Sequence, residues 1–119
     1  MKSVTFTDGI AINGDCLDQQ VIQQTKEYLT EGSVPLVLTD PPYGNVVAEE
    51  WDKTKLTDGE FVDWMLQWTE AWSQFLVPRG AFYVWGGLGT RQFRPFLKYL
   101  VAAESPNFQL ANVITWSKK

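Results

Sequence analysis

The stretch Val-Pro-Leu-Val-Leu-Thr-Asp-Pro-Pro-Tyr-Gly, residues 34–44, decides the fold of this chain. Residues 34–38 form a compact apolar run, which is typical of a strand buried in a sheet. Pro35 is compatible with that strand only near its start, because proline cannot donate a backbone hydrogen bond. An acid, two prolines and an aromatic ring follow at once. The stretch therefore predicts a buried strand that ends in a stiff loop rich in acceptors.

Two short extended pieces and a helix are predicted before this strand. Residues 4–6 and 10–12 flank a turn at Asp8-Gly9, as the two arms of a small hairpin do. Apolar residues then recur at helical spacing over residues 17–29, and Gly32 suits the end of that helix.

A second helix is predicted to begin near Thr57. Thr57 and Glu60 have the spacing of a capping box. One face of this helix is aromatic and aliphatic, and the simplest interpretation is core packing. The residues on that face are Phe61, Trp64, Met65, Trp68, Trp72, Phe75 and Leu76.

The rest of the chain predicts a strand, a helix and a last strand. Pro78-Arg79-Gly80 is expected to break the second helix, and residues 81–85 predict the next buried strand. Residues 86–89, Gly-Gly-Leu-Gly, are interpreted as a turn that needs permissive dihedrals. The third helix is expected to start at Arg94 or to kink at Pro95. Its apolar face comprises Phe93, Phe96, Leu97, Leu100 and Val101, and residues 108–116 predict the closing strand.

Strands that alternate with helices predict an α/β fold with a parallel, doubly wound sheet covered on both faces. Ligands of such sheets bind beyond the carboxyl ends of the strands. Three segments stand directly after predicted strands, and they are Gly14-Asp15-Cys16, residues 40–44 and Trp85-Gly86-Gly87.

Composition narrows the possible functions. The 119 residues suit one domain or a piece of one, and no apolar run is long enough to cross a membrane. The chain has no histidine, which excludes a Ser-His-Asp triad, a Cys-His pair and a His-ligated zinc site within it; we predict no metal site. The single cysteine, Cys16, forbids an internal disulfide and suits a reducing cytoplasm.

The charge of the chain is divided unevenly along the sequence. Net charge is −9 over residues 1–77 and +5 over residues 78–119, which predicts that a polyanion would bind the second segment. The alternative interpretation is that the basic residues of this segment are ordinary solvated surface charge.

The loop after the central strand suits a planar group that carries an NH₂. The Asp40 carboxylate and the carbonyls of Pro41 and Pro42 are acceptors, while the two prolines remove two donors. Two acceptors can take the two N–H bonds of an amine while the ring of Tyr43 stacks on its plane. An exocyclic amine of a nucleobase fits this description. The alternative interpretation is a rigid Pro-Pro turn with an exposed acid.

Residues 36–44 resemble the catalytic motif of DNA amino-methyltransferases, which use S-adenosylmethionine to methylate an exocyclic amine of adenine or cytosine. Gly14-Asp15-Cys16-Leu17-Asp18 is similar to the motif that precedes the catalytic one in the beta class of this family. Further similar segments follow in the order of that class, and they are Trp51-Asp52, the Trp-rich helix, residues 80–87 and residues 111–116. The resemblance implies an incomplete, Rossmann-like S-adenosylmethionine-dependent methyltransferase fold.

The resemblance also implies roles for single residues. Asp40 and the carbonyl of Pro41 would accept the two hydrogen bonds of the target amine within the Asp40-Pro41-Pro42-Tyr43 motif, and Tyr43 would stack on a base flipped out of double-stranded DNA. Asp15 would contact the adenine moiety of S-adenosylmethionine, with Cys16 and Asp40 also on the cofactor side. Taken alone, Asp15 suits a helix cap equally well, and Cys16 suits a small buried residue. In this family, aspartate at the first position favours adenine over cytosine.

The Phe-x-Gly-x-Gly cofactor motif and the target-recognition region of the family are absent from residues 1–119. We therefore expect an amino-terminal catalytic half of an adenine-N6 methyltransferase. Two alternatives remain, which are a split enzyme completed by a second chain and an inactive remnant that acts as a binding or assembly module. Because two neighbouring strands are expected to be missing, we predict a compensating contact such as a dimer, a swapped strand, or pairing of the first strand with residues 36–38.

Overall fold

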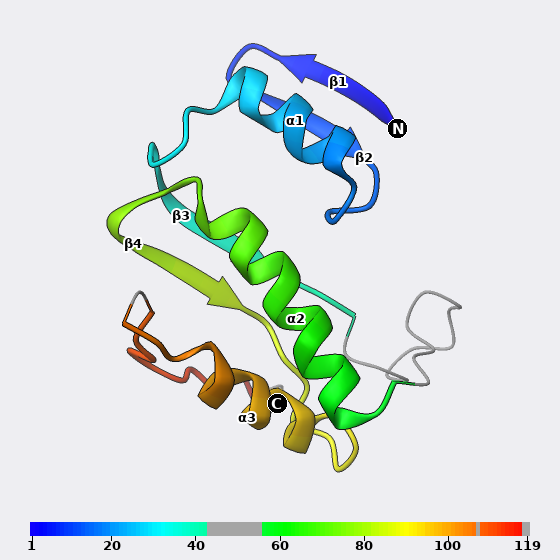
Figure 1. Cartoon of the computed structure of the whole chain (residues 1–119), viewed down its shortest axis with the longest axis vertical. Helices are drawn as coiled ribbons and strands as arrows, with labels where there is room; N and C mark the ends of the chain where they lie inside the picture. Colours follow the sequence, from blue (N-terminus) through cyan, green and yellow to red (C-terminus); the bar gives the residue numbers. More distant parts are fainter. Residues whose placement is uncertain (43–55, 107, 118–119) are drawn as a thin grey trace.

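The structure, a computed structural model, describes residues 1–42, 56–106 and 108–117 of the 119-residue chain. The described elements are β1 (Lys2–Phe6), β2 (Gly9–Asn13), α1 (Gln19–Tyr28), β3 (Val34–Thr39), α2 (Asp58–Ser73), β4 (Leu76–Val84) and α3 (Phe93–Ala103). Figure 1 shows a hairpin with α1 at one end of the molecule and the layers built by β3, α2, β4 and α3 at the other. None of the helices in the described ranges has both the length and the apolar character that crossing a membrane requires.

The amino-terminal strands form the predicted hairpin. β1 and β2 pair antiparallel, with Phe6 opposite Gly9, so the turn is Thr7-Asp8 and lies one residue before the predicted position. Helix α1 follows and ends at Tyr28. Gly32 is beyond that end, in the link to β3, where its φ of 67° is one that glycine adopts without strain.

Strands β3 and β4 are parallel neighbours, as the alternation of elements predicts. Their register runs from Leu36 opposite Ala81 to Thr39 opposite Val84, but Val34 lies opposite Leu76. The prediction that Pro78-Arg79-Gly80 precedes the strand was therefore wrong. The ladder begins at Leu76, and these residues form a bulge in β4, where Pro78 needs no ladder bond and Arg79 has a φ of 66°.

Helix α2 begins as predicted. Thr57 is the residue before its first turn, its hydroxyl accepts the Glu60 N–H at 3.2 Å, and the Glu60 carboxylate accepts the Thr57 N–H at 3.1 Å. The helix ends at Ser73, so Phe75 and Leu76, which were predicted on its apolar face, lie outside it. Phe75 is nevertheless buried, and it packs on the ring of Trp72.

Helix α3 begins at Phe93, one residue before the predicted start, with Pro95 in its first turn. Its buried residues are Pro95 and Tyr99, whereas the predicted apolar positions Leu97 and Val101 are 43% and 73% exposed. Tyr99 lies in the core between α2, α3 and β4, and its hydroxyl is 2.7 Å from Thr69 Oγ1. The core cluster consists of Phe61, Met65, Trp68 and Tyr99.

The predicted strand over residues 108–116 does not form. A single bridge joins Ser105 to Phe108, and the residues from 109 to 117 have no strand assignment. Extended backbone becomes a strand only against a partner edge, and no such edge in the described ranges pairs with this segment. Ile114 and Trp116 are accordingly 79% and 72% exposed.

The doubly wound sheet is present only in part. β1 and β2 form one two-stranded sheet and β3 and β4 another, so the first strand does not pair with residues 36–38. Phe82 and Val84 on one face of the second sheet pack against the core cluster. The expectation of cover on both faces was wrong for the described residues, since Leu36, Leu38 and Tyr83 on the opposite face are 44%, 60% and 54% exposed.

Candidate active site

The carboxyl edge of the β3–β4 sheet brings two of the predicted segments together. The Trp85 N–H donates to the Thr39 carbonyl at 2.9 Å, and Thr39 Oγ1 donates to the Tyr83 carbonyl at 3.2 Å. These bonds extend the pairing to the last residue of β3, so Asp40-Pro41-Pro42 leaves the sheet beside Trp85-Gly86-Gly87. Asp40 is exposed and the two prolines are half-buried. Tyr43 and Gly44 lie outside the described residues.

The loop at residues 86–89, after β4, needs glycine because of a close packing contact and not because of a positive φ. Gly32 is the glycine with positive φ in the described ranges, so the prediction of permissive dihedrals in the loop was wrong. A side chain at Gly86 would instead overlap the ring of Phe96 in α3. The loop therefore packs directly on α3, which keeps the backbone beside Asp40 close to that helix.

The Asp15 turn between β2 and α1 is the second predicted segment. Asp15 Oδ1 accepts the Leu17 N–H at 2.8 Å, and the Asp15 carbonyl accepts the Asp18 N–H at 2.9 Å. The helix-cap role that the sequence allowed for Asp15 belongs to Asp18, whose Oδ1 accepts the Gln20 N–H at 2.8 Å. Asp15 is thus an exposed residue in a tight turn, and the second oxygen of its carboxylate retains acceptor capacity for a ligand.

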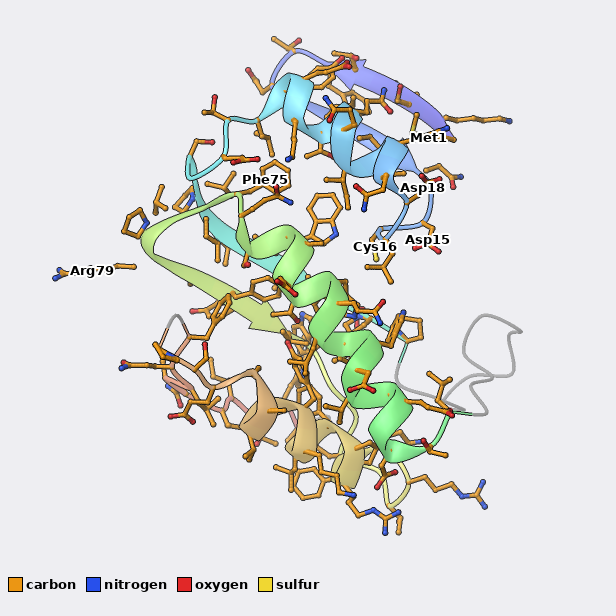
Figure 2. The ribbon with its side chains drawn as sticks, in the orientation of Figure 1. Met1, Asp15, Cys16, Asp18, Phe75 and Arg79 are labelled. Atoms are coloured by element: carbon orange, nitrogen blue, oxygen red, sulfur yellow. The ribbon has the colours of Figure 1, made fainter. Side chains whose placement is uncertain are left out.

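Cys16 differs from its prediction. It is exposed, not buried, and it lies with Asp15 on the loop that Figure 2 shows between the hairpin and α2. Partial desolvation of the thiol raises its pKa, and the neighbouring Asp15 carboxylate raises it further. At neutral pH Cys16 is therefore protonated and a poor nucleophile.

The structure does not place Asp15 and Asp40 on one sheet, as the doubly wound prediction required. Asp15 follows the end of β2, and Asp40 follows the end of β3, which belongs to the other sheet. In Figure 1 β2, β3 and β4 nevertheless run in a similar direction, from upper left to lower right. The two acids thus follow strand ends that point the same way, with no strand between the two sheets in the described ranges.

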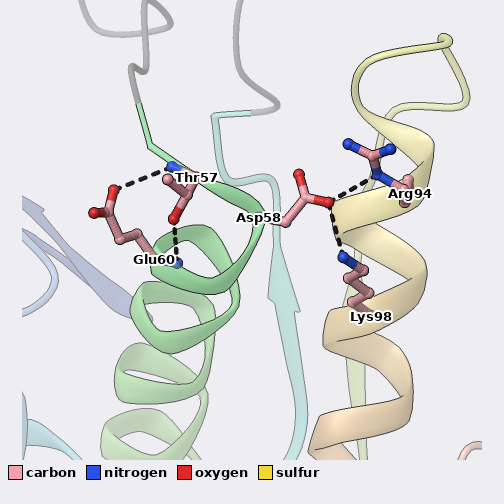
Figure 3. Close-up of polar contacts among 5 residues, drawn as sticks. All are labelled: Thr57, Asp58, Glu60, Arg94 and Lys98. Atoms are coloured by element: carbon pink, nitrogen blue, oxygen red, sulfur yellow. Dashed lines mark hydrogen bonds and ion pairs between the residues drawn. The ribbon is translucent and has the colours of Figure 1, made fainter.

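An ion-pair cluster at the start of α2 and α3 was missed by sequence reasoning. Asp58 Oδ2 accepts from Arg94 Nε at 2.8 Å and from Lys98 Nζ at 3.0 Å (Figure 3). These two hydrogen bonds lower the pKa of Asp58 below its ordinary value of 3.8. The i, i+4 spacing of Arg94 and Lys98 puts both on one face of α3, but only the packing of the helices could identify their partner.

No three histidine, cysteine or acidic side chains gather as a metal site within the described part of the chain. Two surface pockets in the described part of the chain, one along α1 and one between β4 and α3, are not lined by Asp15, Asp40 or the two prolines. The candidate site is thus an exposed edge that presents acceptors.

The family model N6_N4_Mtase, described as DNA methylase, matches residues 34–119. The chain belongs to this family. The match begins at Val34, the first residue of β3, and includes the Asp40–Pro42 edge and the glycine loop beside it. Asp15 and Cys16 lie before the matched residues. Family membership supports DNA as the substrate, methyl transfer to an N4 or N6 amine as the reaction, and S-adenosylmethionine as the usual methyl donor.

Proposed function

We propose that this chain carries the catalytic motif of an adenine-N6 DNA methyltransferase that uses S-adenosylmethionine. The observation that supports it most directly is the position of Asp40-Pro41-Pro42 at the carboxyl end of β3, next to Trp85 and the glycine loop. Ligands of parallel sheets bind at this edge. The segment supplies acceptors and lacks the proline N–H donors, which suits an amine that must donate two hydrogen bonds.

In the proposed reaction Asp40 and the Pro41 carbonyl accept the two N–H bonds of the target amine. Both contacts favour a pyramidal nitrogen, whose lone pair is otherwise delocalised into the base. The cofactor supplies an electrophilic methyl group on a sulfonium. Transfer of this methyl group would leave the cofactor as a neutral thioether, and the proton lost by the amine nitrogen would pass to Asp40 or to water. Positioning and charge placement are the contributions of the protein.

Residues that follow β2 and residues that follow β3 are both proposed to take part in binding the base and the cofactor. Tyr43 stacks on the flipped adenine. Asp15 accepts from the adenine moiety of the cofactor, with Cys16 beside it and Asp40 on the methyl side. The fit of Asp15 to this role rests on its exposed carboxylate, of which one oxygen is engaged by Leu17.

We further propose that an additional segment, in cis or as a second chain, completes the cofactor pocket between the two sheets. The uncovered apolar face of the β3–β4 sheet supports this, because Leu36, Leu38 and Tyr83 expose surface that a folded protein normally buries. A second copy of this chain is an alternative occupant of that face. The cytoplasmic location expected from the single cysteine stays a prediction.

Two alternative functions are compatible with the same geometry. The first is cytosine-N4 methylation, because the family includes both amine targets and the Asp40 edge suits either base. The second is a module that serves only in binding or assembly, for which the exposed apolar face of the β3–β4 sheet is suited.

The test is labelled methyl transfer from S-adenosylmethionine to duplex DNA, by the chain together with its completing segment, followed by base analysis. N6-methyladenine is the expected product. Asp40→Ala should lower the rate by about 10²–10³, the usual effect of losing one such electrostatic contact. Asp63→Ala, which removes an exposed carboxylate from α2, is the matched control and should leave the rate unchanged. Full activity of Asp40→Ala would contradict the assigned chemistry, and 4-methylcytosine as product would favour the first alternative.

A further inference from the structure

A single indole links the Asp15 turn to α2. Trp72 lies in the last turn of α2, and its Nε1 donates to the Cys16 carbonyl at 3.0 Å. The Trp72 ring is half-buried and packs on the ring of Phe75, with centroids 5.5 Å apart. Because Phe75 is 1% exposed, the indole is supported from the core side and its N–H is held toward the turn.

The hydrogen bonds inside the Asp15 turn do not fix its position relative to α2. Asp15 Oδ1 to the Leu17 N–H and the Asp15 carbonyl to the Asp18 N–H set the shape of the turn. They join residues within four positions of one another, so they leave the location of the turn relative to α2 undetermined. That location depends on contacts with the body of the molecule, and among the described residues these include the Trp72 bond and the packing of Leu17 against the core cluster.

We propose that Trp72 is a positioning residue that holds the Asp15–Cys16 turn against α2 and thereby sets where the Asp15 carboxylate meets the cofactor. The cofactor part of this inference rests on the proposed function; the hold on the turn rests on the geometry alone. Trp72 was predicted from sequence only as core packing, and its indole N–H adds a polar role to that packing.

The chain contains a matched control for this role. Trp68 lies one turn earlier on α2 and is 3% exposed, and its Nε1 is buried with no hydrogen-bond partner among the described residues. Trp72→Phe removes a bonded N–H and keeps an aromatic ring beside Phe75. Trp68→Phe removes an unbonded N–H from a tighter site but keeps an aromatic ring in the core cluster that Leu17 packs against, so it should destabilise the fold without breaking the bond from Trp72 to the turn.

Cys16 provides the readout because it is the single cysteine of the chain and its own carbonyl accepts the Trp72 bond. The rate of its reaction with a disulfide reagent such as DTNB, measured against pH on the folded chain, reports the surroundings of the thiol. Release of the turn should reduce desolvation of the thiol, so Trp72→Phe should react faster, by about threefold or more near pH 8, with the midpoint of its pH profile moved down. Trp68→Phe should match the wild type. A wild-type rate and midpoint in Trp72→Phe would overturn the proposal, as would equal acceleration in both variants.

Kinetics of the chain together with its completing segment test whether Trp72 affects cofactor binding through Asp15. Trp72→Phe should raise KM for S-adenosylmethionine by about tenfold, the equivalent of about 1.4 kcal/mol, while kcat changes little, because the Asp40 edge is untouched. Faster Cys16 labelling with an unchanged KM would overturn the placement of Asp15 at the cofactor and leave the Trp72 hold standing. Unchanged labelling with an unchanged KM would overturn the Trp72 hold and leave the proposed function standing.

Discussion

Asp40 and Tyr43 act on the same base in different ways in the proposed reaction. Asp40 contributes a charge that matters most as the amine becomes tetrahedral and positive. Tyr43 contributes a ring face that matters as soon as the base leaves the duplex. The carboxylate should therefore affect the rate of transfer, and the ring should affect binding of the flipped base.

Replacement of Tyr43 should separate these effects. Tyr43→Ala should weaken binding of the flipped base by about 1–3 kcal/mol, the usual value of one base–aromatic stack. Tyr43→Phe and Tyr43→Trp keep a ring and should retain much of the activity. Fluorescence of a 2-aminopurine placed at the target position measures the flipped state. Tyr28→Ala, on α1, is the control, and equal loss in Tyr43→Phe and Tyr43→Ala would show that stacking is not the role.

The buried hydroxyls of Thr69 and Tyr99 should contribute unequally to the free energy of unfolding. Thr69 Oγ1 donates to the Met65 carbonyl at 2.7 Å, so the Tyr99 hydroxyl donates to Thr69 Oγ1. Tyr99→Phe leaves Thr69 bonded and should cost about 0.5–1.5 kcal/mol of unfolding free energy, while Thr69→Val strands a buried hydroxyl and should cost about 1–3 kcal/mol. Urea unfolding measures both. A larger loss in Tyr99→Phe than in Thr69→Val would contradict this direction of donation.

At the scale of elements, the start of α2 is held from two sides. The Thr57–Glu60 capping box satisfies the first N–H groups of the helix, and Asp58 joins its first turn to α3 through Arg94 and Lys98. A carboxylate in this turn also interacts favourably with the positive end of the helix dipole. These contacts join the first turns of α2 and α3, the helices that follow β3 and β4 in the chain.

The Asp58 contacts predict a specific pH dependence. Because the folded protein lowers the pKa of Asp58, the stabilisation is fully present above the ordinary value of 3.8 and is lost as pH falls through the lower folded value. Asp58→Asn should therefore have a lower Tm than the wild type at neutral pH, and the gap should close below about pH 3.8. Added salt should also narrow the gap, since Arg94 and Lys98 are exposed and screened. A gap that persists unchanged to pH 2 would assign the loss to helix packing and not to charge.

At the scale of the whole molecule, the two small sheets share no ladder, although β2, β3 and β4 run in a similar direction (Figure 1). Asp15 follows a strand of one and Asp40 follows a strand of the other, and the described residues cover the β3–β4 sheet on one face only. A ligand that contacts both Asp15 and Asp40 would lie between two sheets that no described strand joins. The arrangement suits a protein whose pocket is completed by another segment.

We therefore expect the chain by itself to bind S-adenosylmethionine weakly or not at all. Isothermal titration calorimetry on the monomer, checked by sedimentation, measures this. Addition of the completing segment should raise the affinity, and Asp15→Ala should then lower it. Micromolar binding by the verified monomer, about −8 kcal/mol, would show that the cofactor site lies within residues 1–119 and that its position is misassigned.

Much of the local structure was predictable from sequence because its causes are local. The hairpin, the capping box at Thr57 and the apolar run of β3 each depend on neighbours within a few residues, and all three form close to their predicted positions. The motif directly follows this apolar run in the sequence, so the sequence alone predicts Asp40 at a strand end, where the structure has it. The predictions failed at Pro78–Gly80 and over residues 108–116, where pairing with a distant strand decides the outcome.

The sequence alone determined which residue types stand at the end of each strand, since hydrophobic periodicity and the proline pattern are properties of neighbouring residues. Only the tertiary structure decided which of those ends share an edge, because strand pairing is set by long-range packing and hydrogen bonding. It put Asp40 beside Trp85, left Asp15 after a strand of a separate sheet, and gave Asp58 its two cations across a helix interface. The bond from Trp72 to Cys16 joins residues 56 positions apart, a contact that no local pattern specifies.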